Sequence, residues 1–241
     1  MKILYLIPAR SGSKEIPNKN IKNIKGKPLL AWSIEQALES TTIQIKKGHE
    51  CRVIVSTDSE LYASIATKYG AEVPFIRPSQ YSKDTSQDYE FIKHAYTFLQ
   101  NNKWKADLII QLRPTQPCRT ISLINKTIDT FISHIDNYTS LRTVSVLTHS
   151  PFKSYIISNN VLIPLFQSYE SIHEPFNQCR QILPQCYIHN GYVDIVKPDT
   201  LQKYKSVTGP KIFPFVMDQP EFIDIDTNKD FQLATKLINI N

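Results

Sequence analysis

A run of five apolar residues, ILYLI at positions 3–7, constrains the fold of this chain more than any other feature. Successive side chains of a strand point to opposite faces of a sheet, so a strand that is apolar at every position must be covered on both faces. Comparable apolar runs follow at 52–56 and 107–112. Strands of this kind are typical of a parallel sheet with a layer of helices on each side.

Segments with helical spacing alternate with these strands, which indicates the α/β class. We predict a three-layer, mostly parallel, doubly wound sheet. Four of the predicted helices are 28–40, 61–69, 121–135 and 228–238. A fifth is capped by Thr85 or Ser86 and ends at residue 101. The further predicted strands are 73–76, 141–148, 192–196, 213–216 and 222–225.

The pattern changes after residue 148. Residues 152–165 alternate around Ser158-Asn159-Asn160, as in a hairpin, and residues 166–190 show little periodicity. We therefore expect a single domain over 1–241, in which the segment from about 150 to 190 is an excursion from the sheet.

Length and composition exclude several classes of protein. A chain of 241 residues suits one large α/β domain, and its apolar stretches are shorter than the ~20 residues of a membrane span. The first strand runs directly into a polar loop, without the layout of a signal peptide, so we expect the cytoplasm as the compartment and no membrane as a partner. Four cysteines without a metal-binding spacing are expected to be thiols in a reducing environment.

The formal net charge of +6 resides entirely in the first 30 residues, which hold seven basic side chains and one acid, Glu15. Arg10, Lys14 and Lys19 stand in the loop after the first strand. A cationic loop at the carboxyl edge of a sheet suits a polyanion, of which a triphosphate is the obvious candidate. The order Gly12-Ser13-Lys14 does not fit a Walker A loop, and a single glycine does not fit a dinucleotide fingerprint.

The composition of this loop also allows two other interpretations. Because the charge is confined to one loop and is not spread over a helix or a sheet face, we do not expect nucleic acid as a partner. A solvated basic loop that binds no ligand stays open on composition alone.

A pair of acids, Asp224 and Asp226, stands near the other end of the sequence. On a strand both side chains would point the same way, and a bound cation would relieve their repulsion. Oxygen ligands suit Mg²⁺ that is held jointly with substrate phosphates. Solvated acids, or acids that cap the terminal helix, are the alternative.

The N-terminal loop resembles the first motif of the acylneuraminate (CMP-sialic acid) cytidylyltransferases. The matching residues are Ala9-Arg10-x-x-Ser13-Lys14-x-x-x-x-Lys19-Asn20. The resemblance implies a Rossmann-like nucleotidyltransferase that binds CTP. It assigns nucleotide binding to Ala9, Arg10, Ser13, Lys19 and Asn20, and neutralisation of the triphosphate and the leaving pyrophosphate to Arg10, Lys14 and Lys19.

Other motifs extend the resemblance from residue 3 to about 230. The segment Asp224-Ile225-Asp226-Thr227 matches the family's metal-binding IDIDT segment, which implies that both carboxylates bind Mg²⁺ and act in catalysis. Arg77-Pro78 and Ser82 resemble a stretch that helps to hold the nucleotide. Asp58 lies in a turn like the family's STD, and helix capping is a sufficient explanation for it.

The proline-rich segment 112–120, directly after a strand, resembles the family's LQPTSPLRT segment. The resemblance implies that Arg113, Thr115 and Gln116 bind the sugar. Arg113 departs from the family pattern, because the sialic acid enzymes commonly have glutamine there, so the identity of the sugar is open. An ion pair with one of the two C-terminal acids is the structural alternative for Arg113.

In the predicted excursion, Lys153, Arg180-Gln181 and Asn190 resemble residues that bind substrate in the family. There the excursion packs on a second subunit, and the matching Lys and Arg reach that subunit's sugar carboxylate. The resemblance thus implies a homodimer. Taken alone, Lys153 and Arg180 fit the usual role of surface charges.

Together these residues predict a Mg²⁺-dependent transfer of CMP from CTP to the anomeric hydroxyl of a nonulosonic, sialic-acid-like α-keto acid sugar, with release of pyrophosphate. A legionaminic-type acid or 3-deoxy-manno-octulosonate is the alternative acceptor. A catalytically silent nucleotide-binding module and a basic interaction protein are the alternatives outside the enzymes. The enzyme hypothesis requires the basic loop and the acidic pair to converge in the folded chain.

Overall fold

The computed structural model describes residues 1–217 and 223–238 of the chain. A six-stranded sheet forms the centre of the described part, in the order β12-β6-β11-β5-β1-β4. Its strands are β1 (Lys2–Pro8), β4 (Glu50–Ser56), β5 (Leu108–Gln111), β6 (Ser140–Val146), β11 (Tyr187–Val196) and β12 (Ile212–Met217). Within this sheet only β11 runs antiparallel to its neighbours, so the sheet is mostly parallel, as predicted.

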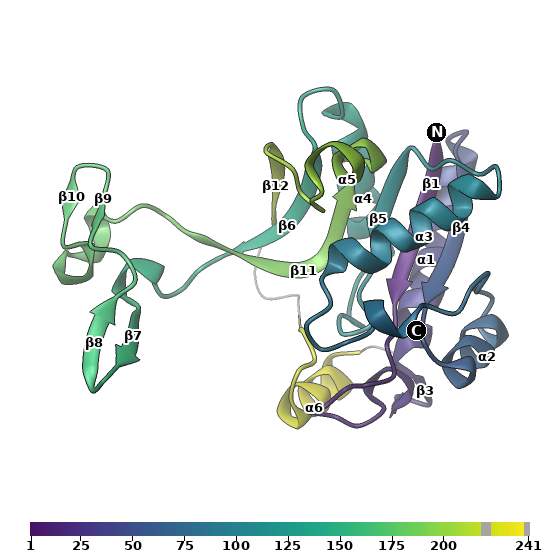
Figure 1. Ribbon diagram of the computed structural model, residues 1–241, viewed down its shortest axis with the longest axis horizontal. Coiled ribbons are helices and arrows are strands. Elements are labelled where there is room, and N and C mark those ends of the chain that lie inside the picture. Colours follow the sequence, from purple (N-terminus) through teal and green to yellow (C-terminus); the bar gives the residue numbers. More distant parts are fainter. Residues whose placement is uncertain (218–222, 239–241) are drawn as a thin grey trace.

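Helices cover both faces of the sheet (Figure 1). Strand β1 shows the reason, because Ile3, Tyr5 and Ile7 pack in one apolar core while Leu4 and Leu6 pack in another. The first core includes residues of α1 (Leu29–Lys46), α2 (Glu60–Lys68) and α4 (Ile121–Ser133), and the second includes residues of α3 (Asp88–Asn101) and α5 (Pro198–Tyr204). The predicted three-layer, doubly wound architecture is confirmed. None of the described helices has the length and apolar character of a membrane span.

Local capping explains where several helices begin. Ser59 caps α2 and Thr120 caps α4, each with a hydroxyl that accepts a backbone N–H. Helix α3 is capped by Gln87, which forms a capping box with Glu90. The prediction of a cap at 85 or 86 was therefore wrong by one or two residues, because the reciprocal bonds with Glu90 select position 87.

Two predicted strands do not form in the described chain. Between 73 and 76 no strand is present, and the preceding Glu72 makes a single bridge with Ile54. Pro74 offers no N–H to a sheet ladder, which explains why pairing stops there. Residues 223–225 also form no strand, because the Ile225 N–H donates instead to Thr115 O at 2.9 Å. Residue 222, which belongs to the same predicted strand, lies outside the described residues.

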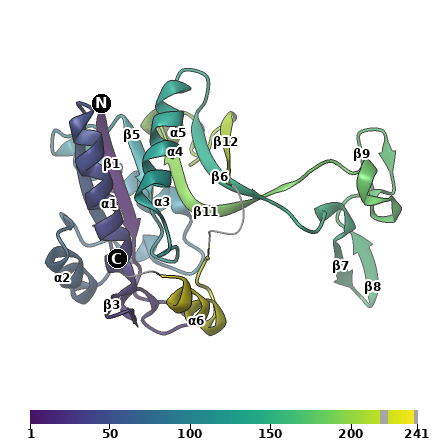
Figure 2. The same ribbon diagram turned by 180° about the vertical axis from the view of Figure 1, so that it is seen from behind.

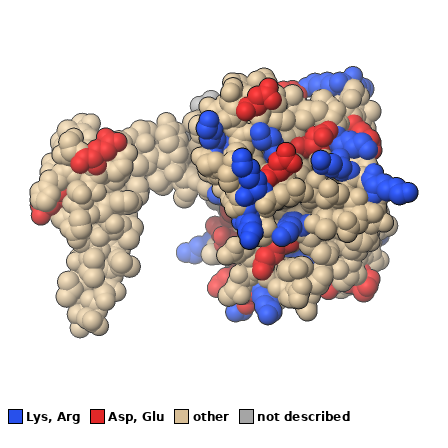
Figure 3. Space-filling model, turned by 45° about the horizontal axis from the view of Figure 1, so that its top comes forward, with Lys and Arg blue, Asp and Glu red and all other residues tan. Residues whose placement is uncertain are grey.

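An arm leaves the body after β6 and returns along β11 (Figures 1 and 2). It contains two hairpins, β7 (Tyr155–Ser158) with β8 (Val161–Pro164), and β9 (Ser168–Tyr169) with β10 (Ile172–His173). The first is the predicted hairpin, and its turn residues Asn159 and Asn160 both have positive φ, as a two-residue hairpin turn requires. The face of the arm that is visible in Figure 3 carries few charged side chains.

The N-terminal loop and the segment before the last helix meet near the carboxyl end of β1. Strands β2 (Asn23–Ile24) and β3 (Lys27–Pro28) form a small hairpin before α1, and α6 (Asn228–Leu237) lies beside it (Figure 1). A third apolar cluster joins these elements and consists of Ile16, Ile24, Leu29, Ile223, Ile225, Ala234 and Ile238. This cluster brings the basic loop next to the acidic segment.

We expect Phe131→Ala to lower the free energy of unfolding by about 3–5 kcal/mol, because the fully buried ring of this α4 residue would leave a cavity in the core. Denaturant unfolding of both proteins measures the difference. Leu61→Ala is the control, since Leu61 is 58% exposed on α2 and its truncation should change stability by no more than about 0.5 kcal/mol. An equal loss of unfolding free energy in the two variants would contradict the assigned core.

Candidate active site

A cleft of about 510 Å³ opens at the carboxyl ends of β1 and β5. The loops after these strands and the first turn of α3 contribute to its walls, and the segment before α6 contributes Asp226. Open parallel sheets bind ligands at this edge. The lining includes Arg10, Ser13, Lys14, Lys19, Asn20, Arg77, Tyr81, Asp84, Asp88, Phe91, Gln111, Arg113, Thr115 and Asp226.

Two of the predicted phosphate-binding cations face a carboxylate in the loop before α3. Arg10 Nη1 lies 2.7 Å and Lys14 Nζ 2.6 Å from the carboxylate of Asp84. Hydrogen bonds from Lys14 and Arg10 hold the pKa of Asp84 below its ordinary value. Ion pairs as exposed as these contribute little to stability, so a bound anion can take the place of Asp84.

Lys19 joins the basic loop to the acidic segment. Its Nζ donates to the carbonyl oxygen of Ile225 at 2.7 Å and to the carboxylate of Asp226 at 3.2 Å. Only 15% of the Lys19 side chain is exposed, against 74% of the Asp226 side chain. The two segments that the enzyme hypothesis requires to converge therefore share one cleft.

The acidic pair keeps the predicted alternation, although it does not lie on a strand. Ile223 and Ile225 are buried, whereas Asp224 and Asp226 are exposed. Asp226 lines the cleft, and Asp224 is not among the described residues that line it. The two carboxylates thus occupy different positions relative to the cations.

The carboxylate of Asp226 fits a divalent cation that a bound ligand helps to coordinate. Among residues 1–217 and 223–238, no group of three or more His, Cys, Asp or Glu side chains is arranged to hold a metal by itself. An exposed carboxylate at a cationic cleft suits instead a metal that phosphate oxygens help to coordinate. Asp226 meets this description.

Buried polar contacts shape the N-terminal loop. Asn20 is buried, and its side-chain amide donates to the carbonyl oxygen of Arg10 at 2.9 Å. Ala9 is also buried, with its N–H on Ser56 O at 2.9 Å, and it is not part of the described lining. These contacts orient the backbone from which Arg10 and Ser13 reach the cleft.

Asp58 holds the same loop from the end of β4. Its carboxylate accepts the Ser11 N–H at 2.8 Å and the Ser11 hydroxyl at 3.0 Å. The cap of α2 is the next residue, Ser59. The interpretation of Asp58 as a helix cap was therefore wrong, because its bonds go to a loop 47 residues away.

Arg77 is a buried cation of the cleft. Only 4% of the residue is exposed, its Nε donates to the Ser56 hydroxyl at 2.9 Å, and its guanidinium lies over the Phe91 ring. Burial lowers its pKa to about 10. Ser82, which was predicted to act with it, is not among the described lining residues, and its hydroxyl lies 3.4 Å from Pro78 O.

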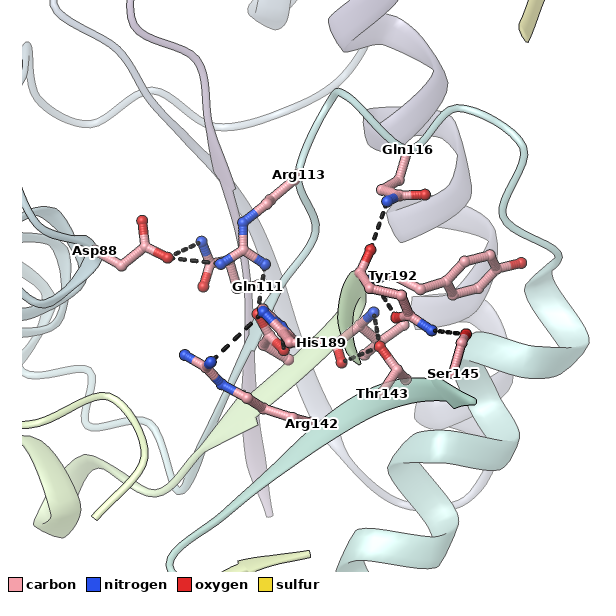
Figure 4. Close-up of polar contacts among 12 residues, drawn as sticks. Asp88, Gln111, Arg113, Gln116, Arg142, Thr143, Ser145, His189 and Tyr192 are labelled. Carbon is pink, nitrogen blue, oxygen red and sulfur yellow. Dashed lines mark hydrogen bonds and ion pairs between the residues drawn. The ribbon is translucent and has the colours of Figure 1, made fainter. Parts of the chain in front are cut away.

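Arg113 lines the cleft from the loop after β5 (Figure 4). The predicted alternative, an ion pair with a C-terminal acid, was wrong. Arg113 Nη2 lies 2.6 Å from Asp88 of α3, and Nη1 donates to Asp194 of β11. Burial alone would lower the pKa of Arg113, but the charges of Asp194 and Asp88 raise it above its ordinary value.

Gln116 and Asn190, both predicted to bind substrate, are buried and link two parts of the protein. The Gln116 amide donates to Asn190 O at 2.6 Å, and the Asn190 amide donates to the Ser145 hydroxyl at 2.9 Å. Neither residue is among the described residues of the cleft lining, to which Thr115 contributes. Their position favours a structural role in joining the loop after β5 to β11.

Lys153, Arg180 and Gln181 lie in the arm and are exposed. Within the described chain, none of them lines the cleft of its own copy. Arg180 and Gln181 border a separate hollow of about 220 Å³ in the arm, next to Leu147 and Cys186. A single copy therefore does not bring these residues to the cleft.

A family model described as "Cytidylyltransferase" matches residues 4–183. This chain belongs to the cytidylyltransferase family. The N-acylneuraminate cytidylyltransferase of Escherichia coli is 33% identical over 97% of this chain, which spans about half (51%) of that protein. The CMP-N,N'-diacetyllegionaminic acid synthase of Legionella pneumophila is 32% identical and is matched over 98% of its length and 100% of this chain.

Solved structures of other cytidylyltransferases share this fold. CMP:2-keto-3-deoxy-manno-octonic acid synthetase in complex with CTP has a TM-score of 0.67 and 17% identity, with 98% of each chain covered. The 4-diphosphocytidyl-2C-methyl-D-erythritol synthase of Anaerococcus prevotii has a TM-score of 0.60 and 14% identity, with 97% of this chain and 96% of the other covered. Cytidylyltransferases of this kind generally use a divalent metal, in agreement with the donors at Asp226.

Sequence reasoning missed several polar residues of this cytidylyltransferase that line the cleft or contact Arg113, among them Gln111, Asp194 and Asp88. Gln111 ends the apolar strand β5, Asp194 interrupts the apolar stretch 192–196 of β11, and a buried polar or charged group in such a place needs a partner. That pattern could have singled them out. Asp88 gave no such signal, because an acid in the first turn of a helix is sufficiently explained by the helix dipole.

The ionisation of Asp194 should make the stability of the protein depend on pH. Burial would raise the pKa of Asp194, but Arg113 and His189 outweigh burial and lower it from 3.8 to about 2. A carboxyl whose pKa is depressed by folding stabilises the protein above its unfolded pKa of 3.8, and this contribution is lost as the pH falls toward 2.

We expect Asp194→Asn to lower the free energy of unfolding at neutral pH by about 2 kcal/mol, the equivalent of the pKa shift. Urea unfolding at a series of pH values should show a smaller loss of stability below pH 4 for this variant than for the wild type. Asp136→Asn, at an exposed position outside the cleft, is the control and should follow the wild type. If the free energy of unfolding changed with pH in the same way for Asp194→Asn and the wild type, the assigned ion pair would be contradicted.

Proposed function

We propose that this protein transfers CMP from CTP to the anomeric hydroxyl of a nonulosonic, sialic-acid-like α-keto acid sugar and releases pyrophosphate. Its family supports the proposal, as do relatives named for N-acylneuraminate, N,N'-diacetyllegionaminic acid and pseudaminic acid. The observation that carries it is the contact between Lys19 and Asp226, because it places the basic loop and the acidic segment at one cleft.

The nucleotide would bind on the N-terminal side of the cleft. Arg10, Lys14 and Lys19 would oppose the charge of the triphosphate and of the leaving pyrophosphate, as fixed cations do in phosphoryl-transfer enzymes. Arg77 would help to place the nucleotide from its buried position. Asn20 would act through the loop backbone that it orients, from Ala9 to Ser13.

The transfer forms a bond from the anomeric oxygen of the sugar to the α-phosphorus and breaks the bond from that phosphorus to the β-phosphate oxygen. The proton of the hydroxyl leaves in the same step, and Asp224 is our candidate acceptor for it. Asp226, with Asp224 as the second ligand, would hold Mg²⁺, which would supply positive charge to the phosphates. Positioning and charge neutralisation suffice, so the proposal needs no covalent nucleophile.

A legionaminic-type acid or 3-deoxy-manno-octulosonate is the alternative acceptor, and Arg113 in place of the family's glutamine motivates it. A catalytically silent nucleotide-binding module is the alternative outside the enzymes. Pyrophosphate release, measured with each of the four nucleoside triphosphates and a panel of keto-acid sugars, separates these cases. Turnover with CTP and one acid identifies the acceptor, and no turnover with any pair would overturn the proposal.

We expect Asp226→Ala to lower kcat by about 100-fold or more, because the transition state would lose its metal-binding carboxylate. Pyrophosphate release under saturating Mg²⁺ and CTP measures the loss, after thermal unfolding has shown that the variant is folded. Asp136→Ala makes the same change at an exposed position outside the cleft and should keep the wild-type rate. A folded Asp226→Ala variant with wild-type kcat would remove the role assigned to Asp226.

We further propose that the arm joins two copies in a homodimer. Its first hairpin exposes large apolar side chains on a projecting segment, with Ile156 56%, Ile157 75% and Leu162 62% exposed in one copy. Contiguous apolar surface of this kind is typical of a protein interface. In such a dimer, Lys153, Arg180 and Gln181 of one copy would approach the cleft of the other.

The cytoplasm is the compartment that we propose for this reaction. Its support is the state of the four cysteines, Cys51, Cys118, Cys179 and Cys186, which are all unpaired in the structure. Unpaired thiols persist in a reducing compartment.

We expect the double substitution Ile157→Asp and Leu162→Asp to convert a dimer into a monomer of 27.7 kDa, because these residues face each other across the hairpin and would bring charge into the apolar interface. Sedimentation equilibrium measures the mass. Ile45→Asp is the control, since Ile45 is 54% exposed on α1 in the body, and its variant should keep the wild-type mass. A wild-type protein that is monomeric at micromolar concentration would contradict the proposed dimer.

A further inference from the structure

Arg113 belongs to a row of polar contacts that connects α3, β5, β11 and β6 beside the cleft (Figure 4). On one side, Nη2 lies 2.6 Å from Asp88, which also accepts the Gln111 amide at 3.2 Å. On the other side, Nη1 donates to Asp194, whose second oxygen lies 2.7 Å from His189 Nε2. Both ends of the guanidinium are therefore occupied by carboxylates.

The partners of His189 define where its proton lies. Nδ1 faces the guanidinium of Arg142 at 3.5 Å, and because a guanidinium only donates, Nδ1 acts as the acceptor. Nε2 then carries the proton and donates to Asp194. This hydrogen bond holds the Asp194 carboxylate in place against Arg113.

The positive charge of Arg113 is fully offset by its neighbours. Two carboxylates contact it, so the group of Arg113, Asp88 and Asp194 has a formal charge of −1. Arg142, at the end of the row, brings the sum to zero. Asp194 stays ionised at neutral pH because its partners hold its pKa at about 2.

The N-terminal side of the cleft has the opposite balance. Arg10, Lys14 and Lys19 face Asp84 and Asp226, which leaves a formal charge of +1. The pairs of Arg10 and Lys14 with Asp84 are exposed enough to exchange with phosphate. The contact between Arg113 and Asp194 is shielded instead, with 20% and 12% of their side chains exposed, and Asp88, with 37% of its side chain exposed, opposes Arg113 from the other side. An anion that approached Arg113 would meet two carboxylates held in place, which is unfavourable.

Packing against β11 also restricts Arg113. Gly191 has a φ of +64°, and a Cβ built there would lie 3.4 Å from Arg113 Nη1, so the glycine leaves room for the guanidinium. The register of β11 against β6 shifts between His189 and Asp194. The shift lets His189 reach the carboxylate of Asp194, five residues further on, while the other oxygen of that carboxylate accepts from Arg113.

We infer that Arg113 donates a hydrogen bond to an uncharged oxygen of the acceptor sugar, a hydroxyl or an N-acyl carbonyl, and does not bind the carboxylate of that sugar. Asp88, Asp194 and His189 are positioning residues, because they orient the guanidinium and cancel its charge. This inference rests on the proposed function, since it concerns the acceptor of that reaction. It means that the enzyme distinguishes acidic sugars at Arg113 by a neutral substituent and not by the carboxylate that they share.

Asp88→Asn tests the charge balance. The amide keeps an oxygen for Arg113 but removes one of the two opposing charges. With the acid that turns over best and its methyl ester as acceptors, the acid-to-ester ratio of kcat/KM should rise about fivefold or more, and about 0.5 M NaCl should remove most of the rise. Glu90→Gln makes the same change in the same helix turn without a contact to Arg113, and it should leave the ratio unchanged.

Arg113→Gln and Arg113→Met test the donor. Glutamine keeps an uncharged N–H donor, whereas methionine keeps only the bulk. We expect each variant to lower kcat/KM by the same factor for the acid and the ester, with the larger loss, about tenfold or more, for methionine. The KM for CTP should change by less than about twofold, because the phosphate-binding cations are untouched. Thermal unfolding is measured first, and if either variant does not fold, Asp88→Asn decides.

The possible results separate this inference from the proposed function. If the wild type releases no pyrophosphate with any acid, the proposed function falls and this inference falls with it. If the wild type is active and an Arg113 variant loses activity with the free acid but not with the ester, Arg113 binds the carboxylate and only this inference is overturned. An unchanged acid-to-ester ratio in Asp88→Asn has the same meaning, because Asp88 would then not offset the charge of Arg113.

Discussion

The closure between the N-terminal loop and the segment before α6 is the constraint on which the cleft depends. Apolar side chains carry it, since Ile16, Ile24 and Leu29 are buried against Ile223 and Ile225, and each such side chain contributes on the order of 1.5–3 kcal/mol. The ion pair that spans the same junction is largely exposed on the Asp226 side and adds about 1 kcal/mol at most. The apolar contacts therefore set the positions of the charges, and the charges remain available to a ligand.

The cleft combines two kinds of ion pair with different chemical consequences. Arg10 and Lys14 share the exposed carboxylate of Asp84, and such pairs exchange partners readily when a phosphate arrives. Arg113 is held by carboxylates on two different elements, of which Asp194 is shielded, and removing either carboxylate would change the balance of charge around the guanidinium. The first arrangement suits a site that binds and releases a polyanion. The second suits a hydrogen-bond donor that must keep one orientation in order to distinguish ligands by an uncharged substituent.

Strand β11 connects the arm to the cleft. It is the one antiparallel strand of the described sheet, its first residues lead out of the arm, and its later residues include the Asp194 that orients Arg113 (Figure 2). Asn190 and Gly191 lie between these two parts, the first tied to the loop after β5 and the second packed on Arg113. The strand that returns from the arm is therefore also the strand that holds Arg113 at the cleft.

Local patterns along the sequence determined the layered α/β fold, because apolar runs such as 3–7 need cover on both faces, and they determined the basic loop and the acids that face it. They did not reveal that 73–76 would stay unpaired or that Asp58 would bind a loop, since both depend on competition between distant hydrogen-bond partners. Which carboxylate each cation meets was decided only by the tertiary structure. Arg113 pairs with Asp194, 81 residues away, because the sheet places β5 beside β11, and no spacing within either segment encodes that contact.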